Sequence, residues 1–562
     1  MSHPFHSNPT AHRVGLFLLA SATLAGCGGS APQDDSALTE EDRWDAAVSA
    51  PIDHGAGPGV APERRMALSQ PKAESIPSGP PDAHLKGVFG APFNWPIIPI
   101  HVVLLPDGRV LAYGSKPSGY QGALQNYSVW DPALGTGDDA KQLLDNTTGT
   151  DIFCGGQVLL PASGNVLLVG GDRFVNEQRN YANDDVNVFT PADDRITRKS
   201  QSMAFQRWYS TAVTTANGEQ VVLGGRVDRF YEGDSQYPPT DDTYASTPEV
   251  YNAAQGWRTL KAARSEFAYG SLGMSWSYPR AWLGPDGRVV VLAASGKTFA
   301  LDTAGNGALD ELPSTLPRGG FNLPGAMYLP GKILSVRDAG AAVVVDINGA
   351  SPVVTPTSHL SADRQFGNAT ILADGKVLVS GGSTTGNDLA GALYATETWD
   401  PATGHWTTTA RAAKARLYHS IAMLLPDGSV LTGGGGGPGP VFNLNAEIYY
   451  PPYLYKADGS GEPAIRPIIE SAPTAGSWGQ HIGVTMFNEK TIDKVALIRF
   501  GGVTHAFGND QRYLALSFSQ SGQHLTVSLP ASANRAPPGF YMLFALDAQG
   551  VPSKAKVLRL GA

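Results

Sequence analysis

The chain has 562 residues, too many for one ordinary core, and its 66 glycines and 42 prolines favour short strands joined by turns over long helices. We therefore expect an all-β protein. Its 41 basic and 50 acidic side chains give a net charge of −9, and the basic residues form no run, so the composition excludes a nucleic-acid-binding surface.

The first 27 residues have the pattern of an export signal. A basic flank and a short apolar segment occupy residues 13–20, and the segment is too short to span a membrane. The ending Leu24-Ala25-Gly26-Cys27 resembles a bacterial lipoprotein cleavage box, which makes Cys27 the lipidated first residue of the mature chain. An ordinary signal with a chance cysteine is the alternative. We expect export from a bacterial cell, with the protein secreted or held at the envelope through the lipid anchor alone.

Residues 28–86 are rich in Pro, Ala, Ser, Gly and acidic residues and show no periodicity, which indicates a disordered linker. From residue 87 to 458 a hairpin unit recurs, in which a tight turn separates two apolar runs. The seven turn glycines are Gly108, Gly164, Gly218, Gly287, Gly331, Gly375 and Gly428. Their spacing is typical of kelch repeats of roughly 50 residues, so we predict a seven-bladed kelch-type β-propeller, a ring without free sheet edges.

Residues 459–562 show short alternating strands with polar turns, which suits an immunoglobulin-like β-sandwich domain. Just before it, the run Gly433 to Gly437 lacks the Lys-Ser/Thr and the helix that a phosphate-binding loop needs. We interpret this run as a close-packed blade corner.

Four side chains of reactive types share one register, nine or ten residues before a turn glycine. They are Cys154, Tyr209, Tyr418 and His419. Equivalent positions of a propeller repeat lie at the same height, so these side chains are expected to converge at one end of the central channel. Tyr278 and Phe366 occupy the same register, and an aromatic residue there is partly a packing preference.

Cys154 is the only cysteine besides Cys27. In an exported protein it has no partner for an intramolecular disulfide, so it is an inert core thiol, an intermolecular bridge or a reactive group.

The segments around these residues carry a family resemblance. They are Phe153-Cys154-Gly155-Gly156, Arg207-Trp208-Tyr209-Ser210, Arg416-Leu417-Tyr418-His419-Ser420, residues 497–505 ending in His505, and Asp510-Gln511-Arg512. In this order they resemble the copper radical oxidases, which include galactose oxidase and glyoxal oxidase, and the resemblance runs from about Trp95 to Leu560.

The resemblance implies one copper ion and a protein-derived Cys-Tyr radical cofactor. It makes Tyr209 an equatorial ligand joined by a thioether to Cys154, Tyr418 an axial ligand and proton acceptor, and His419 and His505 the imidazole ligands. Two imidazoles and a phenolate suit Cu(II). Neighbouring residues of a regular strand point to opposite faces, so the backbone must turn at Tyr418 for both it and His419 to reach one metal. His505 lies beyond the propeller, and the last domain would have to project it into the channel.

The expected function is oxidation of a small primary alcohol or aldehyde by O2, with release of hydrogen peroxide, by a monomeric enzyme. An alternative is a non-catalytic kelch propeller that binds a protein or a cell-surface glycan, since a fold does not fix a function. A third possibility is an oxidase that acts on a polymer at the cell surface.

The chain departs from galactose oxidase in two respects. Val227 stands where that family member has a tryptophan that shields the radical; the candidate replacements are Trp95, Trp208, Trp276 and Trp282. The amino-terminal carbohydrate-binding domain and its sugar-binding residues have no counterpart here, which makes galactose a poor candidate substrate.

The remaining histidines outside the register are expected to be packing or surface residues: His84, His101, His359, His405, His481 and His524.

Overall fold

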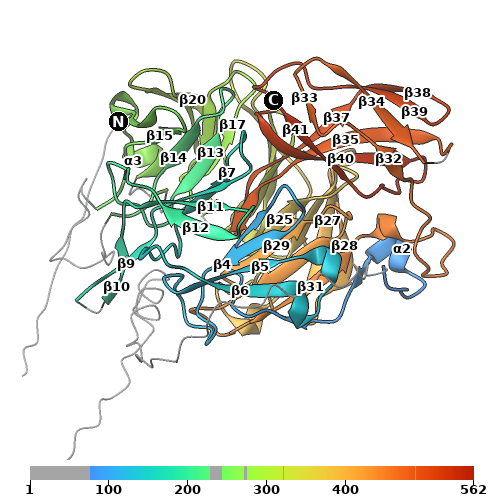
Figure 1. Ribbon diagram of the computed structural model, residues 1–562, viewed down its shortest axis with the longest axis horizontal. Helices are drawn as coiled ribbons and strands as arrows, with labels where there is room; N and C mark the ends of the chain where they lie inside the picture. The colour runs from blue at the N-terminus through green and yellow to red at the C-terminus, as the bar shows by residue number, and fades with distance from the viewer. Residues whose placement is uncertain are drawn as a thin grey trace, which may run out of the picture.

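A computed structural model describes residues 76–561, apart from 177, 228–242, 271–274, 321 and 488. Short β-strands make up nearly all of its regular structure (Figure 1). The few helices are single turns: α2 (Ala83–Lys86), α3 (Glu266–Tyr269), and the 3₁₀ turns η2 (Pro132–Leu134), η3 (Asp138–Ala140), η4 (Lys261–Ala263), η6 (Asp338–Gly340), η7 (Leu389–Gly391) and η8 (Pro452–Leu454). Among the described residues, no helix has the length and apolarity needed to cross a membrane.

Seven antiparallel sheets form the blades of the propeller. Blade 1 holds β3 (His101–Leu104), β4 (Val110–Tyr113), β5 (Asn126–Trp130) and β6 (Lys141–Asp145). Blade 2 holds β7 (Gly156–Leu159), β8 (Val166–Val169), β11 (Val186–Thr190) and β12 (Arg195–Arg198), with the hairpin β9 (Asp172–Val175) and β10 (Gln178–Ala182) beside it. Blade 3 holds β13 (Thr211–Thr214), β14 (Gln220–Leu223), β15 (Glu249–Asn252) and β16 (Gly256–Thr259).

The remaining blades follow the same order. Blade 4 holds β17 (Arg280–Leu283), β18 (Val289–Leu292), β19 (Lys297–Asp302) and β20 (Ala308–Thr315). Blade 5 holds β21 (Gly325–Leu329), β22 (Lys332–Val336), β23 (Ala342–Asp346) and β24 (Val353–Pro356), and blade 6 holds β25 (Asn368–Ile371), β26 (Val377–Ser380), β27 (Ala395–Asp400) and β28 (His405–Arg411). Blade 7 holds β29 (Ser420–Leu424), β30 (Val430–Gly434) and β31 (Asn445–Tyr450).

All seven predicted turn glycines connect the first two strands of a blade, and each has a positive φ, between 73° and 91°. Glycine adopts this left-handed conformation without the steric cost that a side chain brings. The positions of these glycines therefore mark the hairpins, and the all-β propeller predicted from the sequence is confirmed.

The ring closes with strands from both ends of the propeller. The short strands β1 (Val88–Phe89) and β2 (Phe93–Asn94) pair antiparallel with β31, in the register Val88 with Tyr450 and Phe93 with Ala446. In Figure 1 this blue N-terminal segment lies beside the orange strands of blade 7. The closure covers the edge of β31 and removes a free sheet edge.

Residues 76–86, which the sequence analysis assigned to the disordered linker, are packed against the fold. The N–H of Gly79 donates to the carbonyl of Gly461 at 2.8 Å, and Ala83 in α2 is fully buried. The Tyr449 hydroxyl donates to the carbonyl of Lys86 at 2.9 Å. The ordered chain therefore begins before residue 87, because these residues cover the end of blade 7.

The C-terminal domain is a sandwich of two sheets, seen in orange and red beside the blades in Figure 1. One sheet holds β32 (Ile469–Ser471), β34 (His481–Met486), β39 (His524–Ser528) and β38 (Phe518–Ser521). The other holds β33 (Ala475–Gly476), β41 (Lys556–Leu560), β40 (Gly539–Asp547), β35 (Ile492–Arg499) and the outer part of β37 (Phe507–Leu516). A separate apolar core that includes Val484, Leu497 and Leu543 lies between them.

One hairpin of this domain enters the propeller. The strand β36 (Gly502–Thr504) pairs with β3 of blade 1, and β37 pairs with β21 of blade 5. The hairpin thus bridges two blades that are separated in the chain, and His505 lies at its tip between β36 and β37. This is the projection that the sequence required of the last domain.

Candidate metal and radical site

All residues of the predicted register except Tyr418 share an uncommon backbone conformation. Cys154, Tyr209, Tyr278, Phe366 and His419 all have a positive φ, between 41° and 73°. Such values are rare outside glycine and occur often at functional sites. The N–H of Tyr209 donates to the carbonyl of Cys154, and the N–H of Tyr278 donates to that of Tyr209, both at 2.8 Å. Neighbouring blades are therefore joined at this position, which sets the height of the side chains around the channel.

The five residues named as ligands or radical cofactor lie in one buried cluster. The Cys154 sulfur is 3.6 Å from Nε2 of His505 and 4.0 Å from Nε2 of His419. The phenol oxygens of Tyr209 and Tyr418 are in hydrogen-bond contact. No side chain of the five is more than 4% exposed. A thiol, two phenols and two imidazoles thus face one small volume.

Tyr418 and His419 reach this volume from adjacent positions because blade 7 contains one extra residue there. A buried arginine precedes the site position in three blades, and it lies eleven residues before the turn glycine in two of them, at Arg207 and Arg364, but twelve at Arg416. His419 has a φ of 66°, which breaks the alternation of a regular strand. The backbone turn expected from the sequence is therefore present.

The glycine run after β30 holds this turn in place. The N–H of Gly436 donates to the carbonyl of Tyr418 at 2.9 Å, and the N–H of Gly435 donates to that of His419 at 3.1 Å. Gly436 has a φ of 103°, and a Cβ there would collide with the carbonyl of Val441. The run is a close-packed corner, as predicted, and its backbone also orients two site residues.

Both imidazoles present Nε2 to the cluster. Nδ1 of His419 is 3.0 Å from the carbonyl of Gly436, so it carries the proton and Nε2 keeps its electron pair. Nδ1 of His505 is 2.5 Å from the hydroxyl oxygen of Thr504. Burial lowers the pKa of His419 to about 3 and places that of His505 well below its ordinary value. Neutral imidazoles oriented through Nδ1 are typical metal ligands.

The acidic members of the cluster are protonated at neutral pH when no cation balances them. Burial raises the pKa of Tyr209 well above its ordinary value, and the neighbouring Cys154 and Tyr418 raise it further. Burial likewise raises the pKa of the Cys154 thiol. A bound cation would displace these protons and compensate the buried negative charge. Two neutral imidazoles with ionisable phenols fit copper(II) by donor type.

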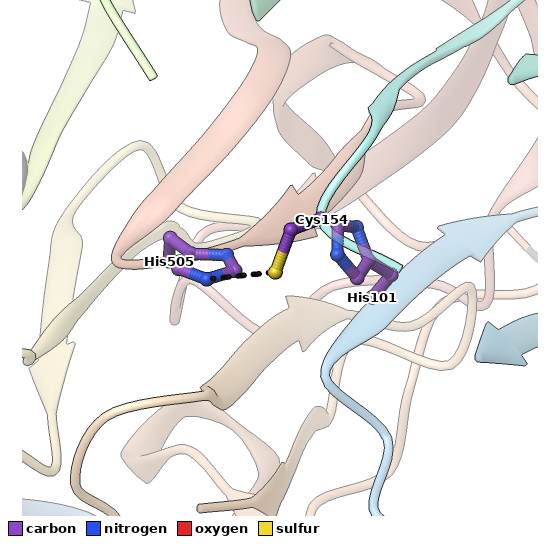
Figure 2. Close-up of side chains that lie close together, drawn as sticks. All are labelled: His101, Cys154 and His505. Carbon is purple, nitrogen blue, oxygen red and sulfur yellow. Dashed lines mark hydrogen bonds between the residues drawn. The ribbon is translucent and has the colours of Figure 1, made fainter. Parts of the chain in front are cut away.

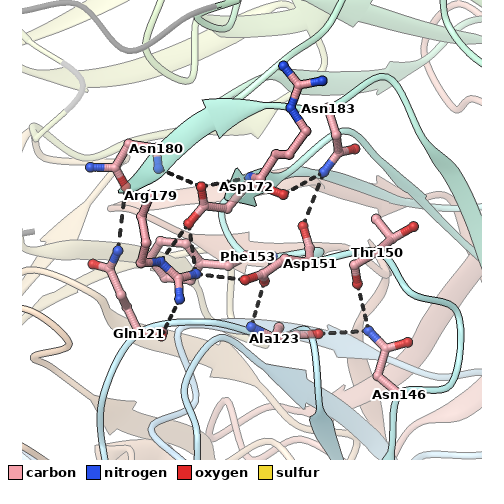
Figure 3. A network of polar contacts seen from close by, with 11 residues as sticks. Gln121, Ala123, Asn146, Thr150, Asp151, Phe153, Asp172, Arg179, Asn180 and Asn183 are labelled. Carbon is pink, nitrogen blue, oxygen red and sulfur yellow. Dashed lines mark hydrogen bonds and ion pairs between the residues drawn. The ribbon is translucent and has the colours of Figure 1, made fainter. Parts of the chain in front are cut away.

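A buried polar network supports the loop that carries Cys154 (Figure 3). Nη2 of Arg179 forms ion pairs with Asp151 at 2.6 Å and Asp172 at 2.7 Å. Asp151 also accepts a hydrogen bond from the N–H of Phe153 at 3.1 Å. The Phe153 ring lies edge-on to His419, with 5.6 Å between the ring centroids. The network therefore fixes the segment 151–154 between blade 2 and a site imidazole.

Tryptophans from two blades cover the Tyr209 ring. The Trp208 ring centroid lies 4.1 Å from that of Tyr209, and the Trp276 centroid lies 5.9 Å away. The guanidinium of Arg226 stacks over both tryptophans, at 4.7 and 5.3 Å. Of the four tryptophans considered from the sequence, these two have ring contacts with the phenol, Trp208 and Trp276.

His101 was expected to be a packing or surface residue, and it is a buried packing residue that also lies beside the site. It is fully buried at the start of β3, and with Cys154 and His505 it forms a group whose ligand atoms all lie within 4.8 Å of one another. Its ring stacks on Tyr113 with the centroids 4.5 Å apart. The sequence signal is weak, because His101 lies seven residues before Gly108, outside the register. The other five histidines named above are exposed or half-buried, as expected: His84, His359, His405, His481 and His524.

The all-β fold and the buried donor cluster agree with those of copper-dependent oxidoreductases among known proteins. The family model described as "Galactose oxidase-like, Early set domain" matches residues 466–560. Galactose oxidase of Gibberella zeae is 27% identical over 84% of this chain and 70% of its own length, and an aldehyde oxidase of Arabidopsis thaliana is 26% identical over 64% of each. A solved fungal alcohol oxidase of the AA5 family, in complex with copper, is 26% identical, covers 85% of this chain and all of its own, and superposes with a TM-score of 0.74.

The chain is similar to the copper radical oxidases, which include galactose oxidase and the glyoxal or aldehyde oxidases. Five of its predicted site residues lie in the cluster described above. The predicted lipidation residue, Cys27, lies outside the described residues.

Proposed function

We propose that this protein oxidises a primary alcohol or aldehyde with O2, giving the aldehyde or carboxylic acid and hydrogen peroxide. The observation that carries the proposal is the buried meeting of the Cys154 sulfur, the Tyr209 and Tyr418 phenols and the Nε2 atoms of His419 and His505. These residues would hold one copper ion, which supplies a Lewis acid for the substrate oxygen and accepts one of the two electrons.

The radical cofactor requires a bond between Cys154 and Tyr209. Thioether formation removes the thiol hydrogen and one ring hydrogen, as two protons and two electrons, and O2 takes them up as hydrogen peroxide. Two contacts support this pairing. The N–H of Tyr209 donates to the carbonyl of Cys154, and the Cys154 and Tyr209 side chains are near enough for a hydrogen bond. An ortho sulfur makes the phenol electron-rich, so its one-electron oxidised form persists under Trp208 and Trp276.

Two phenols divide the chemistry between them. The Tyr418 oxygen accepts the proton of the substrate hydroxyl, and the oxidised Tyr209 oxygen takes the carbon-bound hydrogen. These two transfers remove two protons and one electron from the substrate. Its second electron would be accepted by the copper ion, and O2 receives both protons and both electrons in the second half of the cycle. The chain orients the reacting groups and excludes water from them. Nδ1 of His419 donates a hydrogen bond to the carbonyl of Gly436, and the side chains of the cluster are buried.

The test is the mass of the peptides that contain Cys154 and Tyr209 after copper loading in air. The proposal predicts one cross-linked species lighter by two hydrogens, and peroxide release on a panel of small alcohols and aldehydes. The variant Cys154→Ala should form no cross-link and release no peroxide. A wild-type protein with neither signal would refute the oxidase, and an unchanged phenotype of Cys154→Ala would favour a non-catalytic propeller.

We also propose that export and a lipid anchor at Cys27 place the enzyme at the bacterial envelope. The pattern of residues 13–27 supports this placement. In cells, the protein should fractionate with membranes, and Cys27→Ser should release it. A soluble wild-type protein in the same fractionation would contradict the anchor.

A further inference from the structure

A small cavity lies where the hairpin of the C-terminal domain enters the propeller. Its volume is about 30 Å³. Its walls come from blades 1, 6 and 7 and from the sandwich, and they include Leu104, Ile371, Ala422, Leu424, Ile498 and Met542. A cavity needs roughly 10–15 Å³ to hold one water-sized molecule, so a molecule somewhat larger than water fits here.

The cavity follows from the way in which the hairpin is paired. Strand β36 pairs with β3 of blade 1, and β37 pairs with β21 of blade 5. Blades 6 and 7 stand between these two blades in the ring. The amide of Gln511 bridges to blade 6, where it donates to the carbonyl of Ala369 at 2.9 Å and accepts from the N–H of Ile371 at 3.0 Å. The space that remains lies against blade 7, where the short side chain of Ala422 fills little of it.

The cavity is apolar because the polar side chains of its wall are engaged elsewhere. Besides the amide just described, Arg499 donates to the carbonyls of Pro537 and Pro538 at 2.9 Å. The neighbouring Ile498 and its strand partner Met542 belong to the propeller core. Successive strand residues point to opposite faces, so the Arg499 guanidinium is directed away from the cavity. A buried water needs roughly two to four polar partners, whereas apolar cavities stay dry and bind apolar atoms such as xenon.

The cavity lies along the two strands that lead to the site imidazoles. Val503 in its wall is two residues before His505, and Ala422 is three residues after His419. Two or three strand residues span roughly 7–10 Å. Figure 2 shows His505 where the hairpin turns, and its Nε2 is 3.6 Å from the Cys154 sulfur. The cavity is therefore close to the donor cluster and is joined to it by two strands.

The loops that connect the strands of each blade lie on the other side of the donor cluster. The loop after β30 meets the start of β29, where the N–H of Gly436 donates to the carbonyl of Tyr418. The cavity wall includes Leu424 at the far end of the same strand. An alcohol that enters past the loops thus leaves the cavity side free. Because the donor side chains are at most 4% exposed, a second reactant needs its own path through the protein.

We propose that this cavity is a docking site for dioxygen on its way to the site. The inference rests on the proposed function, since that reaction consumes O2 after the alcohol has been oxidised. Dioxygen is small, uncharged and apolar, so its transfer from water into a dry apolar cavity is favourable. The fold then separates the routes of the two substrates, with the alcohol on the loop side and O2 beside the hairpin.

The first experiment locates an apolar atom in the wild-type protein. Crystals are pressurised with xenon, which binds in apolar cavities. We expect a xenon atom between Ala422, Ile498 and Met542. This measurement needs neither copper nor activity. Crystals without xenon there, or with an ordered water molecule in its place, would overturn the assignment.

The second experiment blocks the cavity and follows the two half-reactions separately. Ala422→Leu places a longer side chain in the cavity from the blade 7 wall, and Met542→Phe does so from the sandwich wall. Both variants should lower kcat/KM for O2 severalfold, measured at saturating alcohol. Both should keep the wild-type kcat/KM for the alcohol and the wild-type copper(II) spectrum. If Ala422→Leu does not fold, Met542→Phe and the xenon experiment decide the question.

Ala281→Leu is the matched control. Ala281 lies six residues before the turn glycine of blade 4, as Ala422 does in blade 7, and it is 1% exposed in a separate apolar core. An extra side-chain volume overpacks either blade, so both variants should lose a similar amount of thermal stability. Only Ala422→Leu should change the O2 kinetics. Equal loss of kcat/KM for O2 in both variants would trace the effect to overpacking and refute the docking site.

The outcome is separable from that of the proposed function. A protein that releases peroxide, but whose kcat/KM for O2 is unchanged by both cavity variants, would refute this inference alone. A protein that holds xenon in the cavity, but releases no peroxide and forms no bond between Cys154 and Tyr209, would refute the oxidase and the dioxygen role with it.

Discussion

Buried ion pairs position the blade segments that carry the site residues. In blade 7, Nη2 of Arg416 pairs with Glu447 at 2.9 Å, and Nη1 donates to the carbonyl of Gly434 at 3.0 Å. The same arrangement joins Arg364 to Glu397 in blade 6, at 2.7 Å. All four charged side chains are at most 3% exposed. Each arginine thus ties the segment before the first strand to the second and third strands of its blade.

We predict that Glu447→Gln destabilises the fold and weakens copper binding. Removal of one partner leaves the Arg416 guanidinium buried without compensation, which costs about 3–5 kcal/mol. At roughly 2–4 °C per kcal/mol for a large domain, the melting temperature should fall by about 6–20 °C. Because Arg416 lies two residues before Tyr418, copper(II) affinity should fall by about 10–100-fold, as for other groups that orient ligands.

Glu397→Gln is the matched control. It breaks an equally buried pair, but the site position of blade 6 is Phe366, which cannot bind copper. Its melting temperature should fall by a similar amount, while the copper affinity and the copper(II) spectrum stay at wild-type values. Thermal unfolding with and without copper, together with a copper titration, measures both quantities. Equal copper affinity in the two variants would refute the claim that the ion pair of blade 7 orients the ligands.

Two further predictions concern the protonation of His419 and the tryptophan that covers the Tyr209 ring. The folded pKa of His419 is about 3 against an ordinary value of 6.5, so its contribution to the stability of the copper-free protein is complete above pH 6.5 and is lost as the pH falls toward 3. His419→Gln should flatten the acid limb of the unfolding free energy by up to about 1.4 kcal/mol per pH unit, and an unchanged slope in denaturant titrations would contradict the neutral imidazole. Trp276→Leu should shorten the lifetime of the oxidised cofactor severalfold, measured by its absorbance decay without substrate. Trp282→Leu should not, since Trp282 packs on Phe507 instead, and equal decay in both variants would argue against a shield at Trp276.

The repeat explains why so much of the site could be predicted. Gly218 and Gly428 each lie in the turn between the first two strands of a blade, so counting back nine residues from them places Tyr209 and His419 on equivalent backbone positions. Local spacing transfers to three dimensions because each blade is the same unit turned about one axis. His505 lies outside the repeat, and only its family motif indicated it.

Residues that act across blade boundaries could not be singled out from the sequence, although Trp276 was among its four candidate tryptophans. His101 begins an apolar strand and lies off the register, and it meets Cys154 only because blades 1 and 2 pack together. Trp276 covers Tyr209 from the next blade, whereas counting along the Tyr209 hairpin led to Val227. Such contacts depend on how blades are packed side by side, which no spacing within one blade encodes.

The propeller assembles a reactive site from a position that has a left-handed backbone in five of the seven blades. The left-handed residue at the head of the first strand is needed for the fold whether it carries Phe366, Tyr278 or a ligand, because its backbone lies where adjacent blades meet. A ligand set can then be built by changing only the side chain at that position. In blade 7, one inserted residue also places Tyr418 beside His419. The arginine pair, which recurs in blades with and without a ligand, belongs to the fold. For this reason the stability of blades 6 and 7 should respond alike to loss of their ion pairs, while copper binding should respond in only one of them.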